Sequence, residues 1–294
     1  MRDPRDVAHA AQLACLLEVS TVKPGNVHPH ADFRDTCYED FLLSALAIGD
    51  AMRQVHRTSV GMTVLRAIRD TRRVVSVNTN LGTVLLLAPL AKAAVARAKG
   101  GLRTRVRKVL QELTVQDARH VYSAIRLAKP GGLGRVPRWD VRRSRVDVSL
   151  VKAMQDAANR DTVAREYVTA FAVTFDVGLP TLKQYLAATP DLRTAIVQTY
   201  LTILATVPDS LIARKVGLRT AVQVSREADK LLRVGGAETV TGRRYLAGLD
   251  RRLRLRGNLL NPGTTADLTA ASLFVALLED GMRRLLGRDK LVHR

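Results

Sequence analysis

The residues best suited to chemistry lie in a few polar, glycine-containing turns, each followed by a helical stretch. The clearest turn is Asn-Pro-Gly-Thr-Thr-Ala-Asp-Leu at residues 261–268. Pro262 lacks a backbone N–H and Gly263 permits a sharp bend, so a helix should begin after them. Thr264 and Asp267 have the spacing of an N-cap and an acid at the third helical position. The turn therefore predicts a capped helix start or, because free N–H groups attract negative charge there, an anion site.

Four other segments repeat this pattern of a polar break before a helix, at residues 23–26, 78–82, 131–134 and 209–215. Together the turns offer main-chain amides, carboxamides, carboxylates and basic side chains, a set suited to phosphates and Mg²⁺ rather than to covalent catalysis. Gly82, in the first turn of an expected helix, costs about 1 kcal/mol relative to alanine, which suggests that another group approaches the backbone there. We expect the five turns to converge on one electropositive cleft lined by helix N-termini.

Patterns for other kinds of chemistry are missing. No serine lies in an elbow motif with a matched histidine, and the glycines at 131–134 do not form G-x-G-x-x-G between a strand and a helix. His28 and His30 are two candidate metal ligands without a third nearby, so we expect them to be exposed in a loop. Cys15 and Cys37 are the only cysteines, and two thiols cannot form a four-thiolate zinc site.

The composition favours helices. Aromatic residues make up only 4% of the 294 residues, and apolar residues make up 47%, enough for a sizeable core. Apolar residues recur at helical spacing, whereas no stretch shows the clear alternation of a strand. We predict an all-α fold: a single multi-helix domain over residues 1–294 with a long loop at 130–147. Polar connections are expected at 97–107 and 208–217, and the β-branched run at 74–77 is a candidate extended segment.

The net charge of +20 and the pI of about 10.9 allow two interpretations. One is a polyanionic partner, either nucleic acid or a small phosphorylated ligand. The other is a general preference for arginine, because the arginines are spread along the whole chain. The N-terminus lacks the apolar region of a signal peptide, and the longest apolar runs are too short to span a bilayer. We therefore expect a cytoplasmic protein without a membrane partner; the sequence leaves its oligomeric state open.

Four segments, in order along the chain, resemble the triphosphoribosyl-dephospho-CoA synthase family. Residues 18–26 contain a glutamate followed by a Lys-Pro-Gly run, like the Pro-Lys-Pro-Gly opening of the family. Residues 78–82 are similar to its Asn-Thr-His-Lys-Gly turn, and residues 209–217 occupy the place of its Asp-Thr…Arg-Gly-Gly segment. Residues 261–268 resemble its Ser-Pro-Gly-Gly-Ser-Ala-Asp-Leu stretch. The four matches span residues 18–268, nearly the whole chain.

The resemblance implies an all-helical, ATP-binding transferase of cofactor biosynthesis. Members of the family move the 5-triphosphoribosyl group of ATP to the 2′-hydroxyl of dephospho-CoA and release adenine. This reaction builds positive charge on the ribose, which a carboxylate stabilises, and needs a base for the hydroxyl and an acid for the adenine. The triphosphate needs Mg²⁺ and cations. ATP and dephospho-CoA, or a related phosphorylated acceptor, are therefore the expected partners, with Mg²⁺ as the cofactor.

Carried over position by position, the resemblance implies three groups of site residues. Asp209 and Asp267 are the candidate catalytic residues. Together with Glu18, they are also the candidate Mg²⁺ ligands. The candidate nucleotide- and phosphate-binding residues are Lys23, Gly25, Asn78, Asn80, Gly82, Arg214, Lys215, Asn261 and Gly263. Each acid also has a plain structural interpretation, since all three stand where an acid can cap or end a helix.

Two departures from the family pattern leave other functions open. Asn80 and Leu81 stand where the family has His-Lys, so neutral side chains replace a cationic pair able to act as acid and base. Residues 118–134 also match the family poorly. The resemblance is thus to a divergent member, and the first alternative is an enzyme of the same fold in another cofactor pathway, such as that of a one-carbon carrier like methanopterin. The second is a basic helical nucleic-acid-binding protein, which Asp209 and Asp267 disfavour because carboxylates without a metal repel phosphates.

Overall fold

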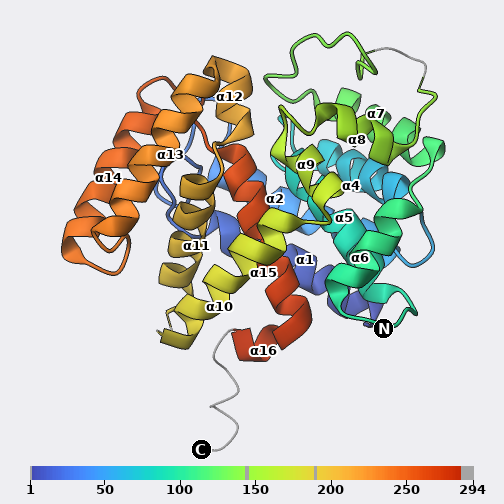
Figure 1. The fold of residues 1–294 in the computed structure, drawn as a ribbon, viewed down its shortest axis with the longest axis horizontal. Helices are drawn as coiled ribbons and strands as arrows, with labels where there is room; N and C mark the ends of the chain where they lie inside the picture. Colours follow the sequence, from blue (N-terminus) through green and yellow to red (C-terminus); the bar gives the residue numbers. More distant parts are fainter. Residues whose placement is uncertain (1, 143–145, 189–190, 286–294) are drawn as a thin grey trace, which may run out of the picture.

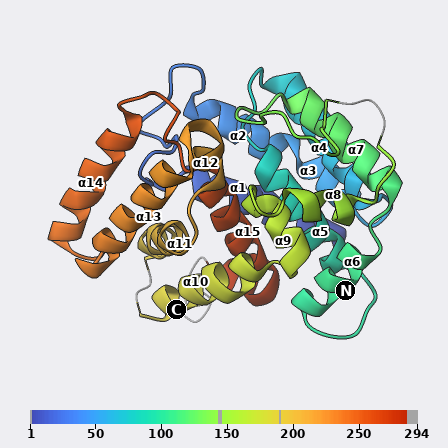
Figure 2. The same cartoon turned by 45° about the horizontal axis from the view of Figure 1, so that its top comes forward.

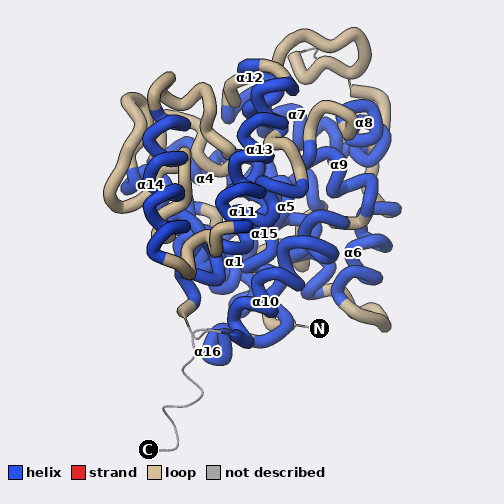
Figure 3. Tube along the Cα trace, turned by 60° about the vertical axis from the view of Figure 1, so that its left-hand side comes forward, coloured by secondary structure: helices blue, strands red, loops and turns tan. Residues whose placement is uncertain are grey.

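The computed structural model describes residues 2–142, 146–188 and 191–285, and helices form nearly all of its regular structure. Over these residues the only β-type pairings are isolated bridges between His28 and Ala31 and between Phe33 and Thr36. The tube in Figure 3 accordingly shows helices joined by loops, and the predicted all-α fold is confirmed. The elements are α1 Pro4–Val19, α2 Tyr38–Ala47, α3 Gly49–Arg53, α4 Val60–Val74, α5 Leu81–Val95, α6 Leu102–Gln111, α7 Val115–Ala128, α8 Leu150–Ala157, α9 Thr162–Thr169, π-helix η1 Val173–Gly178, α10 Leu179–Ala188, α11 Leu192–Thr206, α12 Ser210–Val216, α13 Leu218–Arg233, α14 Val240–Arg254, α15 Gly263–Asp280 and α16 Met282–Leu285.

Helix α15 runs through the middle of the molecule, with α1, α5 and α11 around it (Figure 1). All residues from 268 to 278 are buried, so the helix has no solvent-facing stripe. An all-round apolar sequence predicts this position, because such a helix is stable only when other elements cover every face. The two hydroxyl groups within residues 268–278 are satisfied inside the helix, since Thr269 donates to Thr265 O (2.8 Å) and Ser272 donates to Leu268 O (2.8 Å).

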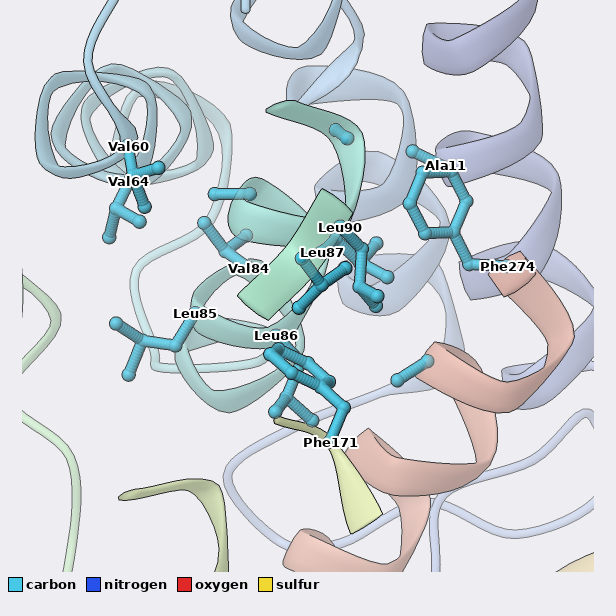
Figure 4. Close-up of a cluster of buried hydrophobic side chains, with 14 of the residues drawn as sticks. Ala11, Val60, Val64, Val84, Leu85, Leu86, Leu87, Leu90, Phe171 and Phe274 are labelled. Atoms are coloured by element: carbon cyan, nitrogen blue, oxygen red, sulfur yellow. The ribbon is translucent and has the colours of Figure 1, made fainter. Parts of the chain in front are cut away.

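Helix α5 is the second central helix and contributes much of the main core (Figure 4). Pro89 lies inside it and cannot donate the usual N–H to the carbonyl of Leu85. The buried hydroxyl of Tyr167 donates to that Leu85 oxygen instead, at 2.6 Å. A proline at this position would ordinarily kink or end a helix, but α5 continues through it because a side chain from α9 supplies the missing donor.

A smaller hydrophobic cluster lies between α11, α12, α13 and α14, on the left of Figures 1 and 2. Helix α11 belongs to both clusters: Ile196 and Ile203 face the main core, whereas Tyr200 and Leu204 face the smaller one. No single helix within the described residues is long and apolar enough to span a membrane, although the bent pair of α11 and α12 has the required length and composition.

The structure corrects several predicted boundaries. Helix α6 begins within the basic connection expected at 97–107 and continues to Gln111, because Leu102, Val106 and Leu110 share one buried face while Arg107 and Lys108 are exposed. Helix α12 lies in the break expected at 208–217, where Asp209 caps it. Both helices are short and carry many charges, which hides a 3.6-residue period in the sequence.

Two helical stretches are each divided into shorter elements. Residues 38–53 form α2, which ends at Ala47, and α3, which begins at Gly49. Residues 163–175 contain the end of α9 at Thr169 and the start of the π-helix at Val173. The run at 74–77 forms no strand, and the described part of the loop at 130–147 contains neither helix nor strand, as predicted; residues 143–145 lie outside the described residues.

The close contact between α4 and α7 yields a prediction for stability. Gly61 N donates to the buried Asp117 carboxylate (2.8 Å), and a Cβ at Gly61 would lie 2.5 Å from the Asp117 Cα. We predict that Gly61→Ala lowers the free energy of unfolding by about 1–3 kcal/mol, because the two backbones must move apart. Urea unfolding measures this change.

Gly248→Ala is the matched control, because a Cβ there meets only the end of the Arg252 side chain at 3.7 Å. Gly248 lies inside α14, so this substitution should raise the free energy of unfolding by up to about 1 kcal/mol through helix propensity. Equal effects of the two substitutions would contradict the assignment of a backbone contact at Gly61.

Candidate functional site

A cavity of about 540 Å³ lies where several helices begin. One wall is built from the starts of α5, α9, α12 and α15, and the other from α7, α8 and the loop after α7. The first wall contains six of the residues predicted from the sequence, namely Asn78, Gly82, Arg214, Lys215, Asn261 and Asp267. The second wall is largely apolar and includes Tyr122, Ile125, Trp139, Val141, Leu150 and Met154.

Asp267 is partly exposed to the cavity, while protein surrounds its carboxyl group. Its Oδ1 accepts a hydrogen bond from the Thr83 hydroxyl at 2.6 Å. A Cβ at Gly82 would lie 2.6 Å from the Asp267 Cγ, so only glycine leaves room for the carboxyl group. The group that the sequence predicts to approach Gly82 is therefore Asp267, which joins the first turn of α5 to α15.

The surroundings of Asp267 favour the protonated form of its carboxyl group. Burial raises the pKa of Asp267 to about 8, although the Thr83 hydrogen bond opposes this, and the nearby acids Glu18, Asp209 and Asp161 raise it further. A carboxyl group with this pKa exchanges its proton near neutral pH, which is the property required of a general acid or base.

Asp267 is not the partner in a helix cap that the spacing predicts. Helix α15 begins at Gly263, and its N-cap residue, Pro262, provides no side-chain cap. Asp267 thus lies beyond the first turn and faces Thr83. The hydroxyl of Thr264 accepts a hydrogen bond from Ser210 (3.1 Å) instead of capping a backbone N–H. The capping-box prediction failed because the proline turn sets the start of the helix earlier than the threonine.

Asp209 caps two helices at once. One oxygen accepts the N–H groups of Leu211 (2.9 Å) and Ile212 (3.1 Å) in α12. The other accepts both the N–H (2.7 Å) and the hydroxyl (2.8 Å) of Thr265 in α15. Burial raises the pKa of Asp209, and these four hydrogen bonds oppose the change. Capping the two helices uses both oxygens of Asp209, and the residue lies behind the cavity wall rather than in it.

Glu18 and Lys23 form a buried ion pair, with Nζ 3.1 Å from Oε1. The ammonium group also donates to the backbone oxygens of Thr21 (2.8 Å) and Glu18, so all three of its protons are used. Burial raises the pKa of Glu18 and lowers that of Lys23, and the pairing opposes both changes. Neither side chain lines the cavity. A phosphate contact by Lys23 or a metal bond by Glu18 would require this pair to open.

Two cations, Arg214 and Lys215, lie on the cavity wall at the end of α12. Arg214 donates to Asp161 at 2.8 Å, and the Lys215 ammonium donates to Asn258 O at 2.8 Å. Burial lowers the pKa of Lys215. Asp161, which is the N-cap of α9 and was not among the predicted site residues, also lines the cavity. An acid at a helix start, the same signal that drew attention to Asp209, could have identified it.

The charge of the cavity is more balanced than the overall charge suggests. Its basic side chains are Arg72, Lys129, Arg138, Arg160, Arg214 and Lys215. Its acidic side chains are Asp35, Asp140, Asp156, Asp161 and Asp267. Because Asp267 stays protonated up to a pH of about 8, the cavity carries a modest excess of positive charge at neutral pH.

The other predicted residues form the support behind the cavity. Asn80 donates to Thr71 Oγ1 (3.0 Å) and Ser44 O (3.4 Å), whereas the neighbouring Asn78 lies on the wall and accepts the Leu81 N–H (3.2 Å). Gly25 and Gly263 also lie behind the wall. The Gly25 N–H donates to Asp250 (2.8 Å), and Gly263 packs on Leu211.

The turn at 23–26 reaches the cavity only through a second turn. Asn26 donates from its side-chain amide to Asn261 Oδ1 at 2.6 Å, and Asn261 lines the cavity. His28, in the same loop, is buried rather than exposed as predicted. Its Nδ1 accepts the His30 N–H (3.2 Å), and burial lowers the pKa of His28 to about 4.

Metal ligands are not preassembled in this site. Within the described residues, no three or more His, Cys, Asp or Glu side chains are placed together to hold a metal ion. Glu18, Asp209 and Asp267 therefore do not form a common ligand set. Asp161 and Asp267 do lie on the cavity wall, and Mg²⁺ is commonly held by one or two carboxylates plus the phosphates of a substrate.

A protein-family model described as CitG, ATP:dephospho-CoA triphosphoribosyl transferase, matches residues 4–285. The chain belongs to this family. A crystal structure from Archaeoglobus fulgidus, described as that of a "putative triphosphoribosyl-dephospho-coA synthase", has a TM-score of 0.64 and 28% sequence identity, and the match covers 82% of this chain and 100% of that one.

Two curated proteins show more limited similarity. They come from Pseudomonas savastanoi pv. phaseolicola and Pseudomonas syringae pv. tomato, with 34% identity over 118 residues and 32% identity over 117 residues. Both are named "Probable 2-(5''-triphosphoribosyl)-3'-dephosphocoenzyme-A synthase". Each match covers 40% of this chain and 38% of the relative, so the similarity spans less than half of either protein.

The raised pKa of Asp267 predicts how stability depends on pH. In an unfolded chain an aspartic acid has a pKa of about 3.9, whereas that of folded Asp267 is about 8. Between these values the folded state binds one more proton, so the contribution of Asp267 to the free energy of unfolding falls as the pH rises, by up to about 1.4 kcal/mol per pH unit. Asp267→Asn should remove this slope, as measured by urea unfolding from pH 5 to 8.

Asp70→Asn serves as the control, because Asp70 lies on α4 outside the cavity and pairs with the exposed Arg73. It should leave the slope of the wild type unchanged. Parallel pH profiles for the wild type and Asp267→Asn would show that Asp267 is ionised in the folded protein.

Proposed function

We propose that this chain transfers the 5-triphosphoribosyl group of ATP to the 2′-hydroxyl of dephospho-CoA and releases adenine. Membership of the CitG family over residues 4–285 supports this reaction. The observation that carries the proposal is a carboxyl group with a pKa of about 8 on the same cavity wall as Arg214 and Lys215. This wall combines a proton-exchanging group with cations for a triphosphate.

In this proposal Asp267 is the catalytic group. In its ionised form, Asp267 accepts the proton of the attacking 2′-hydroxyl while that oxygen forms a bond to the ribose C1′ of ATP and the bond to adenine breaks; the departing adenine takes up a proton from water. Until it takes up the proton, the negative carboxylate also stabilises the positive charge that develops on the ribose. Thr83 and Gly82 hold it in place through the 2.6 Å hydrogen bond and the close backbone contact.

The triphosphate is bound by the remaining side chains of this wall. Arg214 and Lys215 supply positive charge, and the Asn78 and Asn261 carboxamides supply neutral hydrogen-bonding groups. The N-terminal turn of α5, which reaches the cavity at Leu81 and Gly82, adds partial positive charge at the same wall. Mg²⁺, when bound through the phosphates and Asp161 or Asp267, would neutralise further negative charge.

A second candidate is the same transfer to another phosphorylated acceptor, such as a one-carbon carrier. Leu81 lines the cavity where the resemblance expects a lysine, and Asn80 is committed to Thr71 and Ser44 behind the wall. The pair therefore offers no acid, base or cation to the acceptor. This difference favours an acceptor other than dephospho-CoA if the standard reaction fails.

Adenine release tests the proposed function directly. The protein, ATP, Mg²⁺ and dephospho-CoA should together yield free adenine, measured by chromatography, and omission of dephospho-CoA should abolish it. Asp267→Asn should lower kcat by about 100- to 10,000-fold, because it removes the proton acceptor. Asp70→Asn should retain the wild-type rate. If folded wild-type protein releases no adenine with dephospho-CoA, this acceptor is ruled out.

The cations can be tested separately from the carboxyl group. Arg214→Ala and Lys215→Ala should each raise the KM for ATP about 10-fold or more, since each removes a charge-assisted contact to phosphate. Arg233→Ala, which changes an exposed arginine paired with Asp229 on α13, is the control. A normal KM for ATP in both cavity variants would place the triphosphate elsewhere.

A further inference from the structure

The loop after α7 contains a strained aromatic residue at the cavity. Trp139, the only tryptophan of the chain, lines the apolar wall. Its φ is +45°, a left-handed conformation that bulky side chains seldom adopt. The loop lies beside α7 at the top of Figure 1. It also lies outside the four segments that resemble the family.

Several hydrogen bonds fix this conformation. The Tyr122 hydroxyl donates to the Trp139 carbonyl at 2.7 Å. Buried Asp140 accepts the N–H groups of Val136 (3.2 Å) and Arg142 (3.0 Å) and pairs with the Arg142 guanidinium. Unusual backbone geometry of this kind persists only where the surroundings hold it, and it concentrates at binding sites. These hydrogen bonds thus hold residues 136–142 in one conformation at the cavity wall.

The lining of the cavity combines aromatic and apolar side chains with cations. Trp139, Tyr122, Ile125 and Met154 line it together with Arg214 and Lys215. A nucleotide matches this combination, because it carries a flat aromatic base at one end and phosphates at the other. An aliphatic chain would need only apolar contact and would not require an aromatic ring on a strained backbone.

We propose that Trp139 stacks on the adenine base of the bound nucleotide and that residues 136–142 form the base-recognition segment. This inference rests on the proposed function, which supplies two adenine-containing ligands, ATP and dephospho-CoA. Stacking on an aromatic side chain contributes about 1–3 kcal/mol per base. That range corresponds to an affinity change of about 5- to 150-fold.

Tryptophan fluorescence tests the contact without any reaction, because Trp139 is the only source of the signal. Titrations with ATP and with dephospho-CoA, each alone, should quench the emission if its adenine stacks on the ring, and tripolyphosphate should not. A response to only one nucleotide identifies which adenine occupies the segment. Equal responses to tripolyphosphate and the nucleotides, or no response to either nucleotide, would overturn the proposal.

Substitutions give a second, independent measurement by calorimetry. Trp139→Ala should weaken the responding nucleotide about 5- to 150-fold, whereas Trp139→Phe should bind within a few-fold of the wild type. Neither should alter the affinity for tripolyphosphate. Tyr122→Phe removes the hydroxyl that holds the Trp139 carbonyl, and it should weaken the nucleotide but not tripolyphosphate.

Thermal unfolding checks that each variant is folded, and if Trp139→Ala is not, Tyr122→Phe and Trp139→Phe carry the test. Wild-type nucleotide affinity in Trp139→Ala, or an equal loss for nucleotide and tripolyphosphate, contradicts stacking. The adenine-release assay separates the two proposals. Quenching without adenine release would retain the base-binding segment and reject the reaction, whereas release without quenching would do the reverse.

Discussion

The contact between the Asp267 carboxyl group and the Gly82 backbone is the constraint on which the site depends. It joins the first turn of α5 to α15, the two helices with the most continuous burial, and Thr83 fixes the orientation of the carboxyl group. Any side chain at position 82 would occupy the space of that carboxyl. The position of the acid is therefore decided by helix packing, and the same packing removes the water that would otherwise favour its ionised form.

Around this contact, most of the buried polar groups support the fold and do not face the cavity. Asp209 holds the starts of α12 and α15 together, and the Glu18–Lys23 pair closes the end of α1. Asn80 links α2 to α4 by donating hydrogen bonds to Ser44 and Thr71. Each group is hydrogen-bonded because an unpaired buried charge or amide costs several times more than the bond contributes.

These supports connect the site to the smaller hydrophobic cluster. The Tyr200 hydroxyl in α11 donates to the Pro24 carbonyl (2.8 Å), and Gly25 is tied to Asp250 in α14. The turn at 23–26 therefore rests on α11 and α14, and through Asn26 it orients Asn261 on the cavity wall. Although this turn does not line the cavity, it transmits the packing of the smaller cluster to a residue that does.

The sequence predicts the helices well because their apolar period is local information. Most of the regular structure is helical, as the apolar spacing predicts, whereas the short helices α6 and α12 begin in segments expected to be polar connections. The candidate site could be predicted only in part. Six predicted residues reach the cavity wall, but the pattern cannot distinguish Asn78 on that wall from Asn80 behind it, two positions away.

The reason is that the direction of each side chain depends on distant residues. The unfavourable glycine at position 82 signals a close approach, yet its partner lies 185 positions later in the chain and becomes known only when α5 and α15 pack together. The apolar wall carries even less signal, because Tyr122 and Trp139 belong to no motif. Their importance rests on a backbone angle and one hydrogen bond that no local pattern specifies.

The electrostatics of the cavity connect substrate binding to the proton of Asp267. Negative charge at the site raises the pKa of this carboxyl group, as the acids nearby already do. A triphosphate would raise it further unless its charge is balanced, so Arg214, Lys215 and a phosphate-bound Mg²⁺ are needed for more than affinity. By neutralising the triphosphate they keep the proton exchangeable near neutral pH, and the base is then available only when the phosphates are correctly paired. In the proposed reaction, binding of the triphosphate and activation of the hydroxyl are thus coupled, because both depend on the charge balance around Asp267.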